Sequence, residues 1–214
     1  MTSSPYILES CRGVKPPGCP RALAVPGEFA AGIEGLLSRA PLPEAFATLG
    51  RAPRHHERFR LSLCACANGC ARPHVADLGL VAAVDLVVDG EACTGCGACA
   101  AVCPDGAIAM VDGVAVVDRE RCLGCGHCVA ACGTGALAAG PVAFRALLGG
   151  RLGRRPRLGL ELRERLDPAS ALELAGRCLE ACASGLRPGL RFGDLVFPSD
   201  RPTGLPGLPA WVRP

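Results

Sequence analysis

The sequence predicts an α+β protein in which a small cysteine-rich domain is inserted into a larger α/β domain. Three observations support this fold class. A cysteine-rich segment occurs twice in the middle of the chain, as EACTGCGACAAVCPDGAIAM from residue 91 and as ERCLGCGHCVAACGTGALAA from residue 120. Segments with the apolar spacing of strands and helices lie on both sides of this repeat. The chain has 214 residues, half of them apolar, which suffices for the core of one large or two small domains.

Charge and cysteine usage exclude several classes of function. The net charge is only +3 and Lys15 is the single lysine, so bulk attraction to nucleic acid is not expected. The longest apolar stretch, 75–88, contains Asp77 and Asp85 and is shorter than a membrane span of about 20 residues. The first residues lack the features of a secretory signal, so we predict a cytoplasmic protein. In a reducing compartment, 15 cysteines at short gaps indicate metal clusters rather than disulfides.

Both copies of the repeat contain the spacing C-x2-C-x2-C-x3-C. Three close thiolates can bind one iron-sulfur cubane only if the backbone between them curls around it, and glycines at 95, 97, 124 and 126 permit this. The run resembles that of bacterial two-cluster ferredoxins over residues 89–139. Between the copies, AIAMVDGVAVVD alternates apolar residues around Asp112-Gly113 and predicts a β-hairpin, as in ferredoxins of this type.

The ferredoxin resemblance implies two 4Fe-4S clusters, in which the fourth cysteine of each run binds the other cluster. One cluster would be bound by Cys93, Cys96, Cys99 and Cys132, and the other by Cys122, Cys125, Cys128 and Cys103. The alternative, zinc held by C-x2-C pairs, has no use for a third close cysteine in both copies. The run departs from the motif where Gly133, not proline, follows the last cysteine. Its N–H could donate to a cluster sulfur and raise that cluster's potential.

Four of the seven cysteines outside the repeat form two spaced pairs. Cys66 and Cys70 form C-x3-C in CANGCARP, and upstream Cys11 and Cys19 form C-x7-C. Together with VADLGLVAAV, GGRLGRRPRL and RFGDLV, these segments resemble the 4Fe-4S half of sirohaem-dependent nitrite and sulfite reductases over most of residues 8–197. Small sulfite reductases of anaerobes also carry a two-cluster ferredoxin domain inserted at this point of the chain.

The reductase resemblance implies a third 4Fe-4S cluster, bound by Cys11, Cys19, Cys66 and Cys70, with Cys70 as the bridge to the iron of sirohaem. Sirohaem carries carboxylates and sulfite is an anion, so both suit basic side chains, arginine above all. The candidate residues are Arg12, Lys15, Arg21, Arg72, Arg151, Arg154 and Arg155. The alternative for the run RLGRRPR is a solvated loop. The chain departs from the family in its first cysteine gap, which is seven residues rather than five, and in Ala67, where the family prefers proline.

Three cysteines have simpler interpretations. Cys64 lies in a strand-like run, where a buried cysteine packs as a small apolar residue, with a cluster-ligand role in place of a neighbouring cysteine as the alternative. Cys178 and Cys182 share one face of a predicted helix, and we expect core packing, with a surface redox pair as the alternative. No histidine is expected to be a ligand, because cysteines already fill each cubane.

The predicted architecture is a discontinuous reductase-like domain of residues 1–88 and 140–200, a ferredoxin domain of residues 89–139, and an extended tail of residues 201–214. Helices are expected near 27–37, within 141–148 and at 168–183. Strands are expected at 59–63 and 81–88.

Two functions fit these residues. The first is an iron-sulfur electron-transfer protein related to sulfite/nitrite reductases, which relays single electrons through two ferredoxin clusters to a third cluster, with or without sirohaem beyond it. The second is a non-catalytic ferredoxin-like carrier or docking module without haem. The reductases place a haem-binding half before this region, whereas ten residues precede Cys11. We therefore expect either a separate chain that supplies that half, or loss of the haem, and in both cases a redox partner protein. The sequence assigns no catalytic residue and does not distinguish sulfite from nitrite.

Overall fold

The computed structural model describes residues 4–198. Its larger part is a five-stranded sheet with the strand order β1-β2-β3-β6-β7. The strands are β1 (Tyr6–Ser10), β2 (Phe59–Cys64), β3 (Leu78–Val88), β6 (Leu137–Leu148) and β7 (Leu160–Glu161). β1, β2 and β3 are parallel, and β6 runs antiparallel to both β3 and β7. This mixed α/β architecture confirms the predicted fold class.

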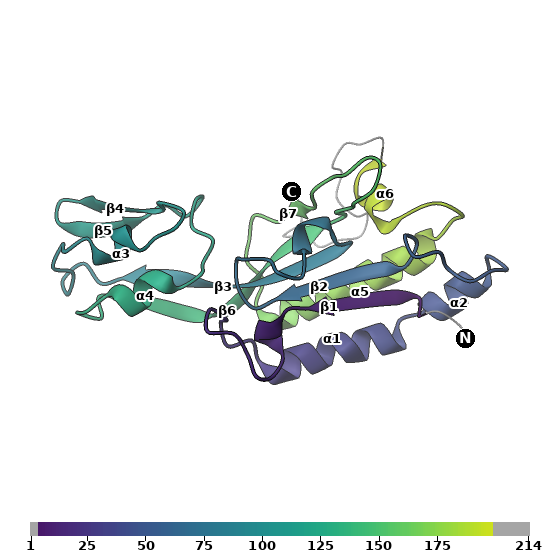
Figure 1. The fold of residues 1–214 in the computed structure, drawn as a ribbon, viewed down its shortest axis with the longest axis horizontal. Coiled ribbons are helices and arrows are strands. Elements are labelled where there is room, and N and C mark those ends of the chain that lie inside the picture. Colours follow the sequence, from purple (N-terminus) through teal and green to yellow (C-terminus); the bar gives the residue numbers. More distant parts are fainter. Residues whose placement is uncertain (1–3, 199–214) are drawn as a thin grey trace.

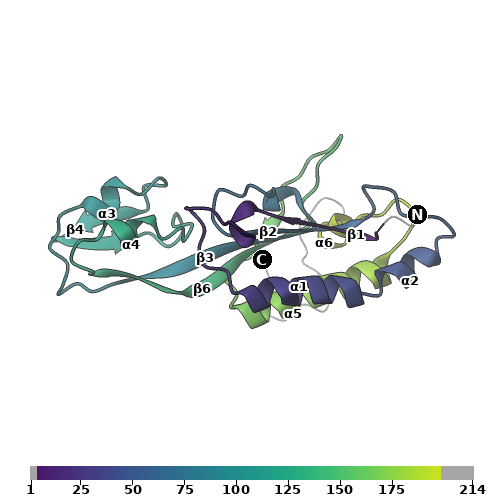
Figure 2. The ribbon, with the colours of Figure 1, turned by 60° about the horizontal axis from the view of Figure 1, so that its bottom comes forward.

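The long helices cover one face of the sheet, as Figure 2 shows for α1 and α5. They are α1 (Gly27–Arg39), the shorter α2 (Leu42–Ala47) and α5 (Pro168–Gly185). Helix α5 begins where the Asp167 carboxylate accepts hydrogen bonds from two free backbone N–H groups, with proline at the first helical position. The shorter elements are η1 (Arg12–Val14), η2 (Pro73–Val75) and α6 (Phe192–Val196). Among residues 4–198, we find no helix of sufficient length and apolarity to span a bilayer.

The core lies between the sheet and these helices. Alternate residues of each strand face the helices, for example Leu61 and Leu63 of β2, which are almost fully buried. Phe29 of α1 stacks on Phe144 of β6 with their ring centroids 4.0 Å apart. The opposite face of the sheet carries a second, smaller buried cluster of Cys64, Ala71, Val81 and Leu147.

The cysteine-rich insert is carried at the end of two long strands. β3 and β6 leave the main sheet together, and Figure 1 shows the insert at the far end of this ribbon. Their pairing continues to Val88 and Leu137, beyond a shift of register between Val84 and Leu86. The insert contains α3 (Ala98–Ala101), α4 (His127–Ala131) and a hairpin of β4 (Ile108–Val111) and β5 (Val114–Val117). The hairpin turns at Asp112-Gly113, both with positive φ, as the sequence predicts.

One predicted element is wrong. Residues 141–148 form the second half of β6 rather than a helix. Phe144, Ala146 and Leu148 alternate into the core, and the segment pairs with β3 from Val142↔Val84 to Leu148↔Leu78. Helix-forming residues were therefore overridden by a strand partner distant in the sequence. The expected helices near 27–37 and 168–183 and the strands at 59–63 and 81–88 are confirmed. The predicted tail of residues 201–214 lies outside the described residues.

Candidate metal centres

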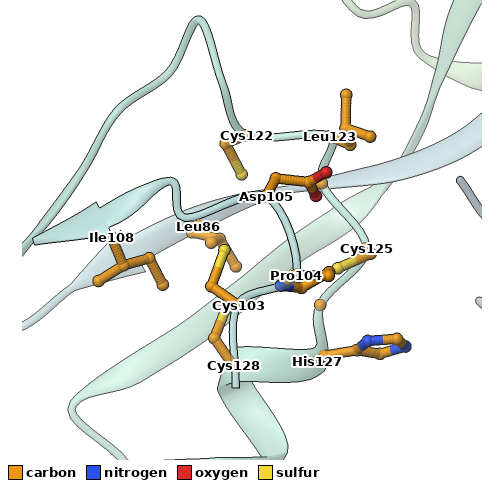
Figure 3. Close-up of a pocket in the computed structure, with 12 residues that line it drawn as sticks. Leu86, Cys103, Pro104, Asp105, Ile108, Cys122, Leu123, Cys125, His127 and Cys128 are labelled. Atoms are coloured by element: carbon orange, nitrogen blue, oxygen red, sulfur yellow. The ribbon is translucent and has the colours of Figure 1, made fainter. Parts of the chain in front are cut away.

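Four cysteines drawn from both repeats surround one hollow in the insert. Cys103, Cys122, Cys125 and Cys128, which we call the second thiol group, line one hollow together. Figure 3 shows their sulfur atoms directed into this space, whereas the His127 ring points away from it. Burial, with smaller contributions from the three neighbouring thiols, raises the pKa of the Cys128 thiol to about 11. Four thiols this close favour a cation that displaces their protons.

The other four cysteines of the repeats form a matching group. Cys93, Cys96, Cys99 and Cys132, the first thiol group, line a second hollow under the β4–β5 hairpin. Cys96 is exposed and Cys99 is buried. The thiols of each group line a hollow. They are not arranged around a single metal ion, because no three Cys, His, Asp or Glu side chains in the described part of the chain have that arrangement.

Hydrogen bonds act on one thiol of the first group. The Thr134 hydroxyl, 3.6 Å from the Cys132 sulfur, is the largest cause of a lowered pKa at this thiol. Backbone N–H groups of Leu137, Thr134 and Gly135 add to the effect. Gly133 is not among these donors, so its predicted influence on the cluster potential stays a prediction.

The loops of both groups depend on glycines with left-handed backbone. Gly95 and Gly124 have φ of +69° and +67°, and Gly97 and Gly126 both have +75°. The first pair is also confined in space. A Cβ at Gly95 would lie 2.6 Å from a carbonyl oxygen of the hairpin turn, and one at Gly124 would lie 2.7 Å from the Val84 carbonyl oxygen. Only glycine fits these positions, which explains the sequence pattern.

Cysteines from two separate segments meet at the carboxyl ends of β1 and β2. β1 and β2 are parallel and end side by side, so Cys11 follows β1 close to the segment that follows β2. The Cys11 N–H donates to the Leu63 carbonyl at 3.0 Å, and the Cys11 sulfur accepts from the Ala65 N–H at 3.2 Å. Burial raises the pKa of the Cys66 thiol, and the nearby thiols of Cys11, Cys70 and Cys19 raise it further. The structure thus brings Cys11, Cys19, Cys66 and Cys70 together, and we call them the third thiol group.

A strongly basic groove adjoins the loop of the third thiol group. Its volume is about 890 Å³, and it is lined by His55, His56, Arg58, Arg60, Arg72, Val75, Asp77, Gly150, Arg151, Leu152, Gly153 and Arg191. Three of its arginines are partly neutralised, since Arg72 and Arg60 contact Glu9 at 3.0 and 3.7 Å and Arg151 contacts Asp194 at 2.8 Å. The remaining positive charge suits an anion with several carboxylates or a small oxyanion.

The predicted basic residues are only partly in this groove. Arg72 and Arg151 line it. Arg21 instead lines a hollow beside Cys66, and neither hollow is lined by the exposed residues Arg12, Lys15, Arg154 and Arg155. Sequence reasoning missed Arg58, Arg60 and Arg191. The first two alternate with buried apolar residues at β2, a pattern that places them opposite the helix-covered face.

The remaining cysteines lie in apolar surroundings. Cys64 packs with Ala71, Val81 and Leu147, and burial raises its pKa to about 11. Cys178 and Cys182 lie in the main core under the sheet, and burial raises both pKa values, that of Cys182 to about 12. These thiols are protonated at neutral pH.

Comparison with known proteins bears on both parts of the chain. Residues 85–133 match the family model of the 4Fe-4S dicluster domain. A 46-residue segment is 44% identical to the coenzyme F420-dependent sulfite reductase of Methanocaldococcus jannaschii, which is 22% of this chain and 7% of that protein. The crystal structure of dissimilatory sulfite reductase I superposes on 87% of this chain with a TM-score of 0.51 and 17% identity.

The mixed α/β fold resembles that of sulfite reductase domains and contains a 4Fe-4S dicluster region. The dicluster domain implies two 4Fe-4S clusters. The chain spans about half (48%) of the sulfite reductase I chain and 25% of the NirA protein of Mycobacterium tuberculosis, to which it is 18% identical with a TM-score of 0.48. The ferredoxin and sulfite reductase resemblances read from the sequence are thereby confirmed.

Proposed function

We propose that the chain is an iron-sulfur electron-transfer protein related to sulfite and nitrite reductases, in which each of the three thiol groups binds a 4Fe-4S cluster. Such a cluster, when bound, supplies one-electron oxidation and reduction. The main support for this proposal is the order of the three thiol groups in space. A hollow of about 570 Å³ is lined on one side by Cys66 and Asn68 and on the other by Cys125 and His127. The second thiol group therefore lies between the first and the third.

The cysteines also have the exposure that a relay needs. Cys96 of the first thiol group is exposed, so a partner protein can approach this group. Cys99 and Cys128, at equivalent places in the two repeats, are buried and keep water away from the inner sides of their groups. Electrons would enter at the first group and leave toward the sheet domain.

The basic groove is the proposed place of sirohaem. Arg72 lies two residues after Cys70 and lines the groove, so the groove begins beside the third thiol group. The arginines of the groove would bind the carboxylates of the macrocycle, which when bound would supply the site of anion reduction. We propose that a partner chain completes the haem site. A carrier without haem is the second candidate.

A reductive titration of anaerobically purified protein tests the relay. We expect about three electron equivalents per chain, one for each cluster, and about two for Cys66→Ser. Cys64→Ala is the matched control, because Cys64 is buried two residues away and should leave the count unchanged. A count of two in the unsubstituted protein would contradict the third cluster. Sharp Soret and red absorption bands would support sirohaem, and a broad shoulder alone would support the carrier.

A further inference from the structure

A guanidinium links the second thiol group to the sheet. Arg165 Nη2 donates to the carbonyl oxygen of Cys122 at 2.6 Å. Its Nη1 donates to the Val84 carbonyl at 2.7 Å and to the Asp85 carboxylate at 2.6 Å. The Arg165 side chain is 16% exposed and that of Asp85 is 59% exposed. The Arg165 guanidinium is thus mostly buried next to Cys122 of the second thiol group, whereas the Asp85 carboxylate that pairs with it is mostly exposed to solvent.

The backbone that carries Arg165 belongs to the sheet domain. The neighbouring Leu166 exchanges two hydrogen bonds with Phe144 of β6, with N···O distances of 2.7 and 2.8 Å. Leu162 donates to Ala146 at 2.9 Å, and both leucines are buried. Arg165 therefore reaches into the dicluster domain from a fixed base in the other part of the molecule.

The contact is close on both sides. The Val84 N–H, at the register shift of β3, donates to the Gly124 carbonyl at 2.9 Å. A Cβ at Gly124 would lie 3.0 Å from the Arg165 guanidinium carbon. The loop from Cys122 to Gly124 is thus clamped between β3 and Arg165.

The two repeats differ at this position. In the first copy, the equivalent glycine, Gly95, faces the Gly113 carbonyl of the hairpin turn. The surrounding segment 89–118 has no lysine or arginine, and its charged residues are Asp89, Glu91, Asp105, Asp112 and Asp118. The second thiol group therefore has a guanidinium where the first has a peptide oxygen. Arg119 and Arg121 add positive charge around it, since they donate to the carbonyl oxygens of Leu86 and Asp105, two residues that line its hollow.

We propose that Arg165 is a positioning residue that fixes the second thiol group against β3 and raises the reduction potential of the cluster bound there, without acting on the first cluster. Adding an electron makes a thiolate-bound cluster more negative, and a fixed nearby cation stabilises that state. The same contact sets the distance from the second to the third thiol group. This inference rests on the proposed function. A higher potential at the second cluster would favour electron transfer from the first cluster to the second.

Redox titrations of the whole chain, followed by electron paramagnetic resonance, test this role. For Arg165→Gln we expect one ferredoxin cluster to show about a tenfold lower ratio of reduced to oxidised protein at a fixed potential, equal to about 59 mV for one electron. Arg165→Lys retains the charge but cannot make all three contacts. In this variant the ratio of reduced to oxidised protein should stay within about twofold of that in the unsubstituted protein. The amide hydrogens around Gly124 should exchange faster. Arg163→Gln is the control, since Arg163 is exposed two residues away.

Each outcome decides a separate point. Equal shifts of both clusters, or no shift of either in Arg165→Gln, would overturn the inference although the clusters are present. If Arg165→Gln fails to assemble the second cluster, the Arg165→Lys variant decides. A tenfold lower ratio of reduced to oxidised protein in Arg165→Lys would overturn the electrostatic role. Absence of 4Fe-4S signals from the unsubstituted protein would instead refute the proposed function.

Discussion

Replacing Gly124 by alanine tests the contact on which the arrangement of the clusters depends. The left-handed φ of +67° costs alanine about 1–2 kcal/mol. The new Cβ would also lie 2.7 Å from the Val84 carbonyl oxygen and 2.9 Å from the Ala83 Cβ, neither of which is a flexible side-chain end. Overpacking of this kind adds about 1–3 kcal/mol. Weakening the Val84–Gly124 hydrogen bond adds about 1 kcal/mol. We therefore expect Gly124→Ala to destabilise the fold by about 3–6 kcal/mol.

Gly97→Ala provides the matched control. Gly97 has a similar φ of +75°, but nothing lies within 4 Å of a Cβ built there. Only the backbone cost of about 1–2 kcal/mol applies. For a chain of this size, a difference of about 2–4 kcal/mol separates the two melting temperatures by roughly 4–16 °C. The assay is thermal unfolding under argon at one scan rate, followed by far-UV circular dichroism. Equal melting temperatures would refute the packing of the second thiol group on β3.

Three further predictions concern the sheet domain. Burial raises the pKa of Asp77 to about 7. Its ionisation therefore lowers the free energy of unfolding as the pH rises from about 4 to 7. Asp77→Asn should be about 1–3 kcal/mol more stable than the unsubstituted protein at pH 8. Its free energy of unfolding in urea should also change less with pH between about 4 and 7. The Arg51 fork holds the Glu57 pKa at about 2. Glu57→Gln should therefore be less stable at pH 7, and its difference from the unsubstituted protein should shrink as the pH falls from about 4.5 toward 2; a constant difference would contradict the ion pair. Cys178→Ala should cost about 1–2 kcal/mol in urea unfolding and leave the iron content unchanged, and loss of iron would contradict core packing.

The thiol groups of the insert were the most predictable part of the molecule. Their cysteines lie within short runs, so the spacing alone limits how the loop can fold, and the glycines mark the positions with positive φ. The third thiol group was predictable only through the reductase resemblance, because Cys11 and Cys66 meet by parallel pairing of β1 with β2.

Features that depend on tertiary contacts could not be predicted. Residues 141–148 form a strand because β3 supplies a partner from another part of the sequence. The basic groove collects side chains from β2, η2, the loop after β6 and the start of α6, so no local run of arginines indicates it. Arg165 looks like an ordinary exposed residue until the insert is placed against β3.

The most direct measurement of the central claim is the content of iron and acid-labile sulfide in anaerobically purified protein. Three occupied thiol groups predict about twelve of each per chain. Cys66→Ser should reduce both to about eight, whereas Cys64→Ala should leave both at about twelve. About eight of each in the unsubstituted protein, or zinc in place of iron, would contradict the account.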